Sequence, residues 1–162
     1  MESKVMKKVT KLTRQESKQM PLEYMISTLN QYFDIYFNNN LKEYNVNRSQ
    51  TTLLLQLSKK DNVTQEYLSK LLDVQEGTIT NTLKKLEKKQ LIKRQPDSKD
   101  RRKKIVTITE EGLKIAEIYR KLNHEIEKEI KLSITENDIE NLKITITEVA
   151  KIISEKNREL KK

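Results

Sequence analysis

Residues 78–112 read TITNTLKKLEKKQLIKRQPDSKDRRKKIVTITEEG. Apolar residues recur in the first part of this stretch at the three- and four-residue steps of an amphipathic helix. Two short β-prone segments, 91–95 and 104–109, follow the helix, and the run between them is rich in charges and turn formers. The stretch therefore predicts a helix that leads directly into a two-stranded hairpin with a cationic tip.

The positive charge of the chain is concentrated in the same stretch. The formal net charge is +9 at pH 7, and residues 84–104 hold eleven Lys or Arg against three acidic residues, so the other 141 residues are nearly neutral. A surface that is merely solvated usually mixes both signs. A concentrated basic stretch is the electrostatic footprint expected for a polyanionic partner such as nucleic acid.

The composition narrows the class of protein. Charged residues make up 35% of the 162 residues, apolar residues another 35%, and only two Gly and two Pro occur, which favours long helices over a many-turned β fold. The absence of Cys excludes a disulfide framework and a thiol redox sensor. Without an apolar segment of membrane-spanning length or a signal-peptide core, a soluble cytoplasmic protein is expected.

Helical signals also precede the quoted stretch. A strongly amphipathic helix is expected over residues 21–40, with Pro at its first position. A second helix starts near Asn47 or Ser49, and Thr64 can cap a short third one. The third helix and the fourth, at about 76–89, have the outline of a helix-turn-helix.

Two long helices are expected after the hairpin. Thr109 can cap the first and Thr135 the second, where Asp138 resembles the third-position partner of a capping box. Apolar residues of the second helix alternate steps of three and four, as in an a/d seam, and are Ile139, Leu142, Ile146, Val149 and Ile153. The apolar stripes exceed what one small domain can cover, so we expect a homodimer through these helices.

The predicted fold is mainly α with a small β-hairpin wing. Residues 47–109 are expected to form a winged helix-turn-helix DNA-binding domain, and residues 21–46 and 110–162 a helical dimerisation region. Residues 1–20 are polar and basic and are interpreted as an N-terminal arm. The arm could be disordered, pack across the dimer or follow the DNA backbone.

The outer face of the fourth helix combines short polar side chains with lysines. With Ile79, Leu83 and Leu86 turned inward at about 100° per residue, short polar side chains near the N-terminal end can face base edges in the major groove. The lysines further along can neutralise phosphates. In isolation such a face would be an ordinary solvated surface, and the adjacent cationic hairpin favours DNA binding. The candidate contacts are Gly77, Thr78, Asn81, Thr82, Lys84, Lys85 and Lys88.

The quoted stretch resembles the MarR family of bacterial and archaeal winged-helix regulators. The pattern is a helix ending Leu-Glu-x-x-x-Leu-Ile, an Arg after it, then Asp-x-Arg, three residues, and Val-x-aliphatic-Thr-x-x-Gly. Its positions are filled by Leu86, Glu87, Leu91, Ile92, Arg94, Asp100, Arg102, Val106, Ile108, Thr109 and Gly112.

This resemblance implies a homodimer on a pseudo-palindromic site in double-stranded DNA. The wing, residues 93–104, would enter the minor groove, where Arg102 is inserted and Asp100 helps to orient it. Arg101 and Lys103 would contact phosphates, and Arg94 belongs to the same candidate DNA-binding set.

The sequence departs from the family pattern at two positions. Asn81 stands where the family often has Arg, so the base preference at that contact is expected to differ. Gln90 stands where a helix-ending Gly is common. This predicts that the fourth helix ends without a left-handed cap.

The resemblance also suggests release from DNA by a small aromatic or phenolic effector. The candidate pocket residues are Tyr32, Tyr36, Phe37 and Tyr119, although aromatics at helical spacing are more often core packing. The sequence shows no catalytic constellation and no cofactor motif. A single His, His124, is a poor basis for a metal site.

The leading hypothesis is a dimeric, sequence-specific transcriptional regulator, and a repressor rather than an activator. A nonspecific architectural nucleic-acid-binding protein would use the same basic surface but show a low specificity ratio. A protein-interaction module would pair its long helices with another chain and bind an acidic partner through its cations.

Overall fold

The computed structural model describes residues 9–98 and 100–160, and the chain divides into two compact units, residues 1–119 and 120–162. The first eight residues of the expected N-terminal arm and Lys99 of the expected wing lie outside the described residues. Within those residues, none of the helices combines the length and the apolar character needed to cross a membrane.

The described part of the arm contains two short helical segments. A 3-10 turn, Val9–Lys11, precedes helix α1, Arg14–Gln19. Thr13 caps α1 reciprocally: its hydroxyl accepts from the Glu16 N–H at 3.2 Å, and the Glu16 carboxylate accepts from the Thr13 N–H at 2.9 Å. All six residues of α1 keep some solvent exposure.

Helices α2, Leu22–Asn40, and α3, Arg48–Lys59, confirm the first two expected helices, and a 3-10 turn, Lys42–Tyr44, lies between them. Asn47 is the N-cap of α3 and accepts from the Gln50 N–H at 2.9 Å. Arg48 joins the two helices by donating to Asp34 at 2.9 Å. The guanidinium also lies 5.5 Å from the centre of the Phe33 ring.

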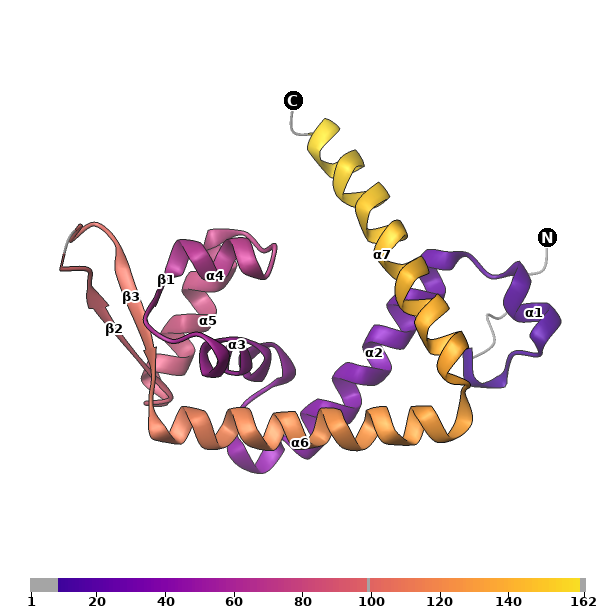
Figure 1. The fold of residues 1–162 in the computed structure, drawn as a ribbon, viewed down its shortest axis with the longest axis horizontal. Coiled ribbons are helices and arrows are strands. Elements are labelled where there is room, and N and C mark those ends of the chain that lie inside the picture. Colours follow the sequence, from indigo (N-terminus) through magenta and orange to yellow (C-terminus); the bar gives the residue numbers. More distant parts are fainter. Residues whose placement is uncertain (1–8, 99, 161–162) are drawn as a thin grey trace, which may run out of the picture. The chain divides into compact units, whose positions relative to one another are not determined.

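Helices α4, Gln65–Leu71, and α5, Glu76–Lys88, form the expected helix-turn-helix (Figure 1). The Thr64 hydroxyl caps α4 by accepting from the Tyr67 N–H at 3.1 Å. As the periodicity predicted, α5 buries Ile79, Leu83 and Leu86. These side chains share the core with fully buried residues of α3 and α4, namely Leu53, Leu54, Leu57 and Leu68.

The expected hairpin is present, and it belongs to a three-stranded antiparallel sheet. Strand β2 is Ile92–Pro96 and β3 is Lys104–Ile108. A strand that the sequence did not predict, β1 (Val63–Thr64), pairs with the other edge of β3 and gives the order β1-β3-β2 (Figure 1). On β3, Val106 pairs with Val63 of β1 on one side and with Arg94 of β2 on the other, and it is fully buried. The sheet therefore fixes the base of the wing to the core.

The end of α5 corrects one expectation. Gln90 has a φ of 59°, so the helix does end with a left-handed residue although it is not Gly. The Leu91 N–H donates to the Leu86 carbonyl at 3.0 Å and the Gln90 N–H to the Glu87 carbonyl at 2.9 Å. This pair of bonds is a Schellman motif. The hydrogen bonds outweigh the steric cost of a β-carbon in that conformation.

Gln90→Gly is expected to raise the free energy of unfolding by about 1 kcal/mol, because Gly adopts the left-handed region without the β-carbon clash. Urea denaturation at neutral pH measures the gain. Gln90→Ala is the matched control, since it keeps the β-carbon and should give no comparable increase. Equal stability of the Gly and Ala variants would contradict the assignment of strain to this residue.

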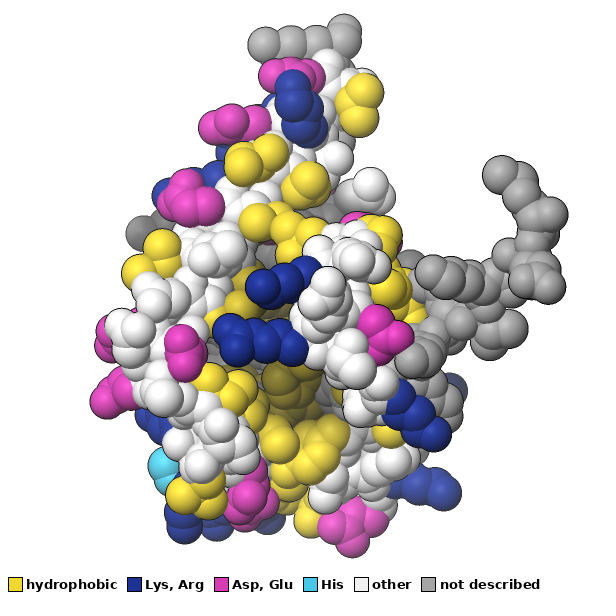
Figure 2. Space-filling view, turned by 90° about the vertical axis from the view of Figure 1, so that its right-hand side faces the viewer, with side chains coloured by type: hydrophobic (Ala, Val, Ile, Leu, Met, Phe, Trp, Pro, Cys, Tyr) yellow, Lys and Arg dark blue, Asp and Glu magenta, His cyan; other side chains and the backbone are white. Residues whose placement is uncertain are grey.

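The long helices after the sheet also confirm the prediction. Helix α6 is Glu110–Ser133, and the Thr109 hydroxyl caps it by accepting from the Gly112 N–H at 3.1 Å. Helix α7 is Glu136–Glu159 and begins at Thr135, whose hydroxyl accepts from the Asp138 N–H at 3.2 Å. Figure 2 shows hydrophobic side chains on the surface of α7, at the top of the view. The exposed seam residues include Leu142 (49%), Ile146 (43%) and Ile153 (55%).

Candidate nucleic-acid interface

The outer face of α5 places most of the predicted helix contacts at the surface. Gly77, Thr78, Asn81, Lys84, Lys85 and Lys88 are all exposed. Thr82 is half-buried, and its hydroxyl donates to the Thr78 carbonyl at 3.0 Å. The short polar side chains lie toward the N-terminal end of α5, and the lysines lie toward its C-terminal end. This order suits a helix that reads bases with its first residues and contacts phosphates with its last.

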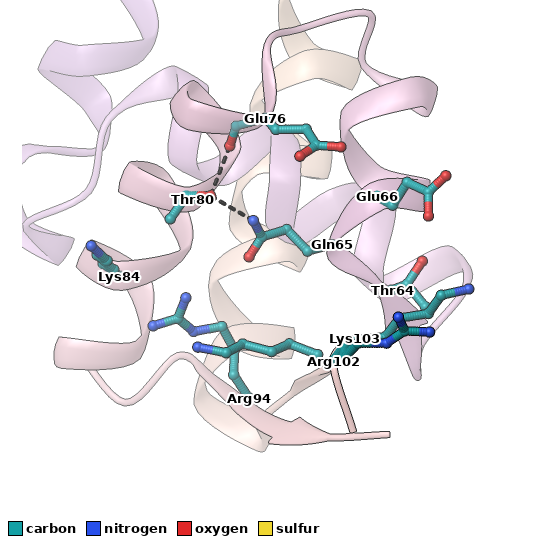
Figure 3. Close-up of a pocket in the computed structure, with 10 residues that line it drawn as sticks. Thr64, Gln65, Glu66, Glu76, Thr80, Lys84, Arg94, Arg102 and Lys103 are labelled. Atoms are coloured by element: carbon teal, nitrogen blue, oxygen red, sulfur yellow. Dashed lines mark hydrogen bonds between the residues drawn. The ribbon is translucent and has the colours of Figure 1, made fainter. Parts of the chain in front are cut away.

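Two residues that the sequence did not single out fix the start of α5. The Gln65 side-chain amide on α4 donates to the Thr80 hydroxyl at 2.5 Å, and that hydroxyl donates to the Glu76 carbonyl at 2.8 Å (Figure 3). This chain of hydrogen bonds joins the two helices of the helix-turn-helix. Polar residues fifteen positions apart give no periodic signal, so only the fold reveals the pair.

The wing holds Arg102 outward. Its Nε donates to the Asp100 carboxylate at 3.1 Å, and its backbone N–H donates to the same oxygen at 3.2 Å. The Arg102 side chain is nevertheless 92% exposed. These hydrogen bonds from Arg102 lower the pKa of Asp100, so the carboxylate stays ionised at neutral pH. Arg101 and Lys103, beside it in the wing, are also exposed.

Arg94 differs from the other predicted DNA contacts because its side chain is mostly buried, with 10% exposed. Its Nε donates to the Glu87 carboxylate at 3.0 Å, and a terminal nitrogen of the guanidinium donates to the same oxygen. The hydrogen bonds from Arg94 are the main reason that the pKa of Glu87 is lowered. Arg94 thus joins β2 to α5 and sets the position of the wing relative to the helix.

Glu87→Gln is expected to lower the stability of the protein at neutral pH but not in acid. The folded-state pKa of Glu87 is depressed, so its stabilisation is complete above the ordinary glutamate pKa of about 4.3. It is lost as the pH falls through the lower, folded-state pKa.

Urea denaturation at pH 7 and at about pH 3 measures this difference. Glu129→Gln on the exposed surface of α6 is the matched control and should show no such pH-dependent difference from the wild type. If Glu87→Gln lowered the free energy of unfolding by the same amount at both pH values, that result would contradict an ionic role for Glu87.

A cleft with a volume of about 350 Å³ separates the wing from the helix-turn-helix (Figure 3). Glu66 and Glu76 line it from the starts of α4 and α5, and the hydrogen bond from Lys70, more than the positive charge of Lys103, lowers the pKa of Glu66. The basic lining residues come from α5 and the wing and are Lys84, Arg94, Arg102, Lys103 and Lys104. Basic residues of α5 and of the wing therefore line the two sides of the same cleft.

The candidate effector residues differ in their burial. Phe37 and Tyr119 are buried, with their ring centres 5.0 Å apart, and the Tyr119 hydroxyl lies 3.2 Å from that of Thr52. Tyr36 is half-buried with its ring edge against Phe37, and Tyr32 is 38% exposed. These contacts pack α2 against the first part of α6. A nearby cavity of about 280 Å³ is lined by α2, α3 and α5, including Arg48, Thr52, Thr78 and Thr82.

Comparison with known proteins agrees with this geometry. A model of the MarR family matches residues 46–104. The multiple antibiotic resistance protein MarR of Salmonella typhimurium is 26% identical over 131 residues, which cover 80% of this chain and 91% of that protein.

Two solved structures extend the comparison to the fold. A MarR transcriptional regulator from Methanosarcina mazei is 30% identical, with a TM-score of 0.70 over 81% of this chain and 97% of that one. The MepR–DNA complex from S. aureus gives 25% identity and a TM-score of 0.77 over 82% of this chain and 98% of that one.

A helix-turn-helix followed by a hairpin with an exposed arginine defines a winged-helix protein. With the family model and these relatives, the chain belongs to the MarR family of transcriptional regulators. Because the matched proteins are regulators, this membership also supports the expectation that the chain is not an enzyme.

Proposed function

We propose that the protein is a homodimeric, sequence-specific regulator that binds a pseudo-palindromic operator in double-stranded DNA. The observation that carries this proposal is that α5 and the wing both contribute basic residues to one cleft, which is lined by Lys84 and Arg102. A helix can enter the major groove while the neighbouring wing reaches the minor groove, where the negative potential is enhanced.

Each part of the surface has a separate role in this proposal. Thr78 and Asn81 at the start of α5 read base edges, and the lysines further along neutralise phosphates. Arg102 enters the minor groove, and Arg101 and Lys103 contact the backbone on either side of it. The solved complex of the related MepR protein with DNA supports the proposal that this chain binds DNA.

The dimer is proposed to form through residues 21–46 and 110–162, with residues 47–109 as the DNA-binding domain. Exposed apolar side chains along α7, such as Ile146 and Ile153, support this division because a monomer would leave them in water. On α2, Leu22 (56% exposed) and Leu29 (45% exposed) are likewise available to a partner. A two-fold dimer presents two copies of α5 to two half-sites.

The mode of action that we propose is repression in the cytoplasm, where the dimer occupies an operator until an effector weakens its hold. A small aromatic compound in the cavity of about 280 Å³ between α2, α3 and α5 would touch Thr78 and Thr82 on α5. It would then bias the position of the helix that reads DNA. The contacts of Tyr32, Tyr36, Phe37 and Tyr119 support core packing more than direct effector binding.

Selection of bound duplexes from a random pool at about physiological salt tests the proposal, because nonspecific binding is largely screened there. The expected result is a two-fold-related motif with half-sites roughly one helical turn apart. Sedimentation of the free protein should show twice the mass of the chain. No enriched motif, with binding confined to low salt, would instead support a nonspecific architectural protein.

A further inference from the structure

A second basic cavity lies beside the C-terminal part of α5, away from the wing cleft. Its volume is about 400 Å³, which is within the range of small-molecule sites. Its walls come from the end of α2, the 3-10 turn Lys42–Tyr44, the start of α3 and α5. Three of the lining residues are Lys42, Lys85 and Lys89, and we call the cavity the lysine pocket.

The charge of the lysine pocket has one sign. None of its lining residues is acidic. Among residues 9–98 and 100–160, no ion pair involves Lys42, Lys85 or Lys89. Elsewhere on the chain, lysines such as Lys70 and Lys114 do pair with a carboxylate of their own helix. The pocket therefore concentrates positive charge without an internal counter-ion.

Lys89 is held in place by neutral groups. Its ammonium donates to the Asn45 carbonyl and to the Gln50 side-chain oxygen, the latter at 3.2 Å. Gln50 is itself buried, with 5% exposed. Burial, and then the positive charge of Lys85, lowers the pKa of Lys89. An anion in the pocket would offset both the desolvation of this ammonium and its repulsion by Lys85.

We propose that the lysine pocket binds an anionic phosphate group, with Lys42, Lys85 and Lys89 as the residues that hold it. Three ammonium groups around a concave, otherwise neutral site suit the charge of a phosphate. The lysines come from both walls: Lys42 lies in the α2–α3 connection, Lys85 in α5, and Lys89 is the C-cap of α5. A bound phosphate would therefore link the end of α5 to that connection. Free phosphorylated ligands and the DNA backbone share this chemistry.

Titration of the free protein with inorganic phosphate, against sodium chloride at matched ionic strength, tests the pocket itself. Saturable chemical-shift changes are expected at the amides of Lys42, Lys85 and Lys89. Lys42→Gln should weaken phosphate binding about tenfold, as expected for loss of one charge-assisted hydrogen bond. Lys121→Gln, which removes an exposed lysine of α6, is the matched control and should bind phosphate as the wild type does.

A second experiment distinguishes a phosphate of the DNA backbone from the phosphate of a free ligand. Only this experiment rests on the proposed DNA binding. If the pocket takes a backbone phosphate, Lys42→Gln should reduce the slope of log affinity for duplex DNA against log salt by about 0.9. If the pocket takes a free ligand, the slope should stay the same while inorganic phosphate binding weakens.

Either of these results supports the proposal. Phosphate shifts that chloride reproduces, together with an unchanged DNA slope for Lys42→Gln, would overturn it. Failure of the protein to bind any DNA would refute the proposed function but would leave the phosphate titration fully interpretable.

Discussion

Gly112→Ala is expected to lower the free energy of unfolding by about 3 kcal/mol, as severe overpacking does. A β-carbon at residue 112 would lie 2.8 Å from the Ile108 side chain and well inside van der Waals contact with the Leu91 carbonyl oxygen. That oxygen is backbone and already accepts the Thr109 N–H at 3.1 Å. It cannot withdraw without breaking the junction of α5, β2 and α6. Urea denaturation gives the magnitude.

Gly77→Ala is the matched control, because Gly77 is the only other Gly in the chain and its β-carbon would meet nothing within 4 Å. Since Gly in a helix interior costs roughly 0.5–1 kcal/mol relative to Ala, this variant should be equally or more stable than the wild type. Similar losses of stability for the two variants would show that helix propensity or the unfolded state, and not the close approach at Leu91, controls the effect.

The tight packing around Gly112 is an example of a contact that could not be predicted from the sequence. The family pattern marked the position, but its close neighbour Leu91 lies 21 residues earlier and is brought there by the sheet. The helices were predictable because periodicity and caps such as Asn47 and Thr135 are local signals. Strand β1 was not, because two residues, Val63 and Thr64, cannot show alternation and pair with β3 more than 40 residues away.

The same limit applies to the candidate interface. The outer face of α5 followed from the 100° rotation per residue. The Gln65–Thr80 hydrogen bond and the lysine pocket join residues whose separation in the chain carries no pattern. The family pattern marked Glu87 and Arg94, but it did not indicate that they pair with each other. The Gln90 prediction failed for a related reason: a residue type preferred at a helix end is a tendency, and the hydrogen bonds of the Schellman motif overrode it.

Arg102→Ala is expected to weaken binding to the selected operator by about tenfold to a hundredfold, while leaving the fold and the proposed dimer intact. Its side chain is 92% exposed and its ion pair is with a wing neighbour, so its removal leaves no buried group without a partner. Fluorescence anisotropy with operator duplex measures the affinity. Lys121→Ala on α6 removes the same charge and is the control that should bind normally. Unchanged affinity for Arg102→Ala would refute the minor-groove role of the wing.

Asp100→Ala tests whether the Asp100 carboxylate orients the Arg102 side chain or acts on DNA only through its negative charge. Removing a negative group from the proposed DNA-binding surface should strengthen binding if only long-range electrostatics matter. If the Asp100 carboxylate holds the Arg102 guanidinium in its working position, as the 3.1 Å hydrogen bond indicates, the variant should bind more weakly. In the Asp100→Ala protein, adding Arg102→Ala should weaken DNA binding much less than it does in the wild type. Because hydrogen bonds from Arg102 lower the pKa of Asp100, this orienting effect should persist at neutral pH and fade only in acid. Tighter binding by Asp100→Ala would mean that the arginine enters the groove without its help.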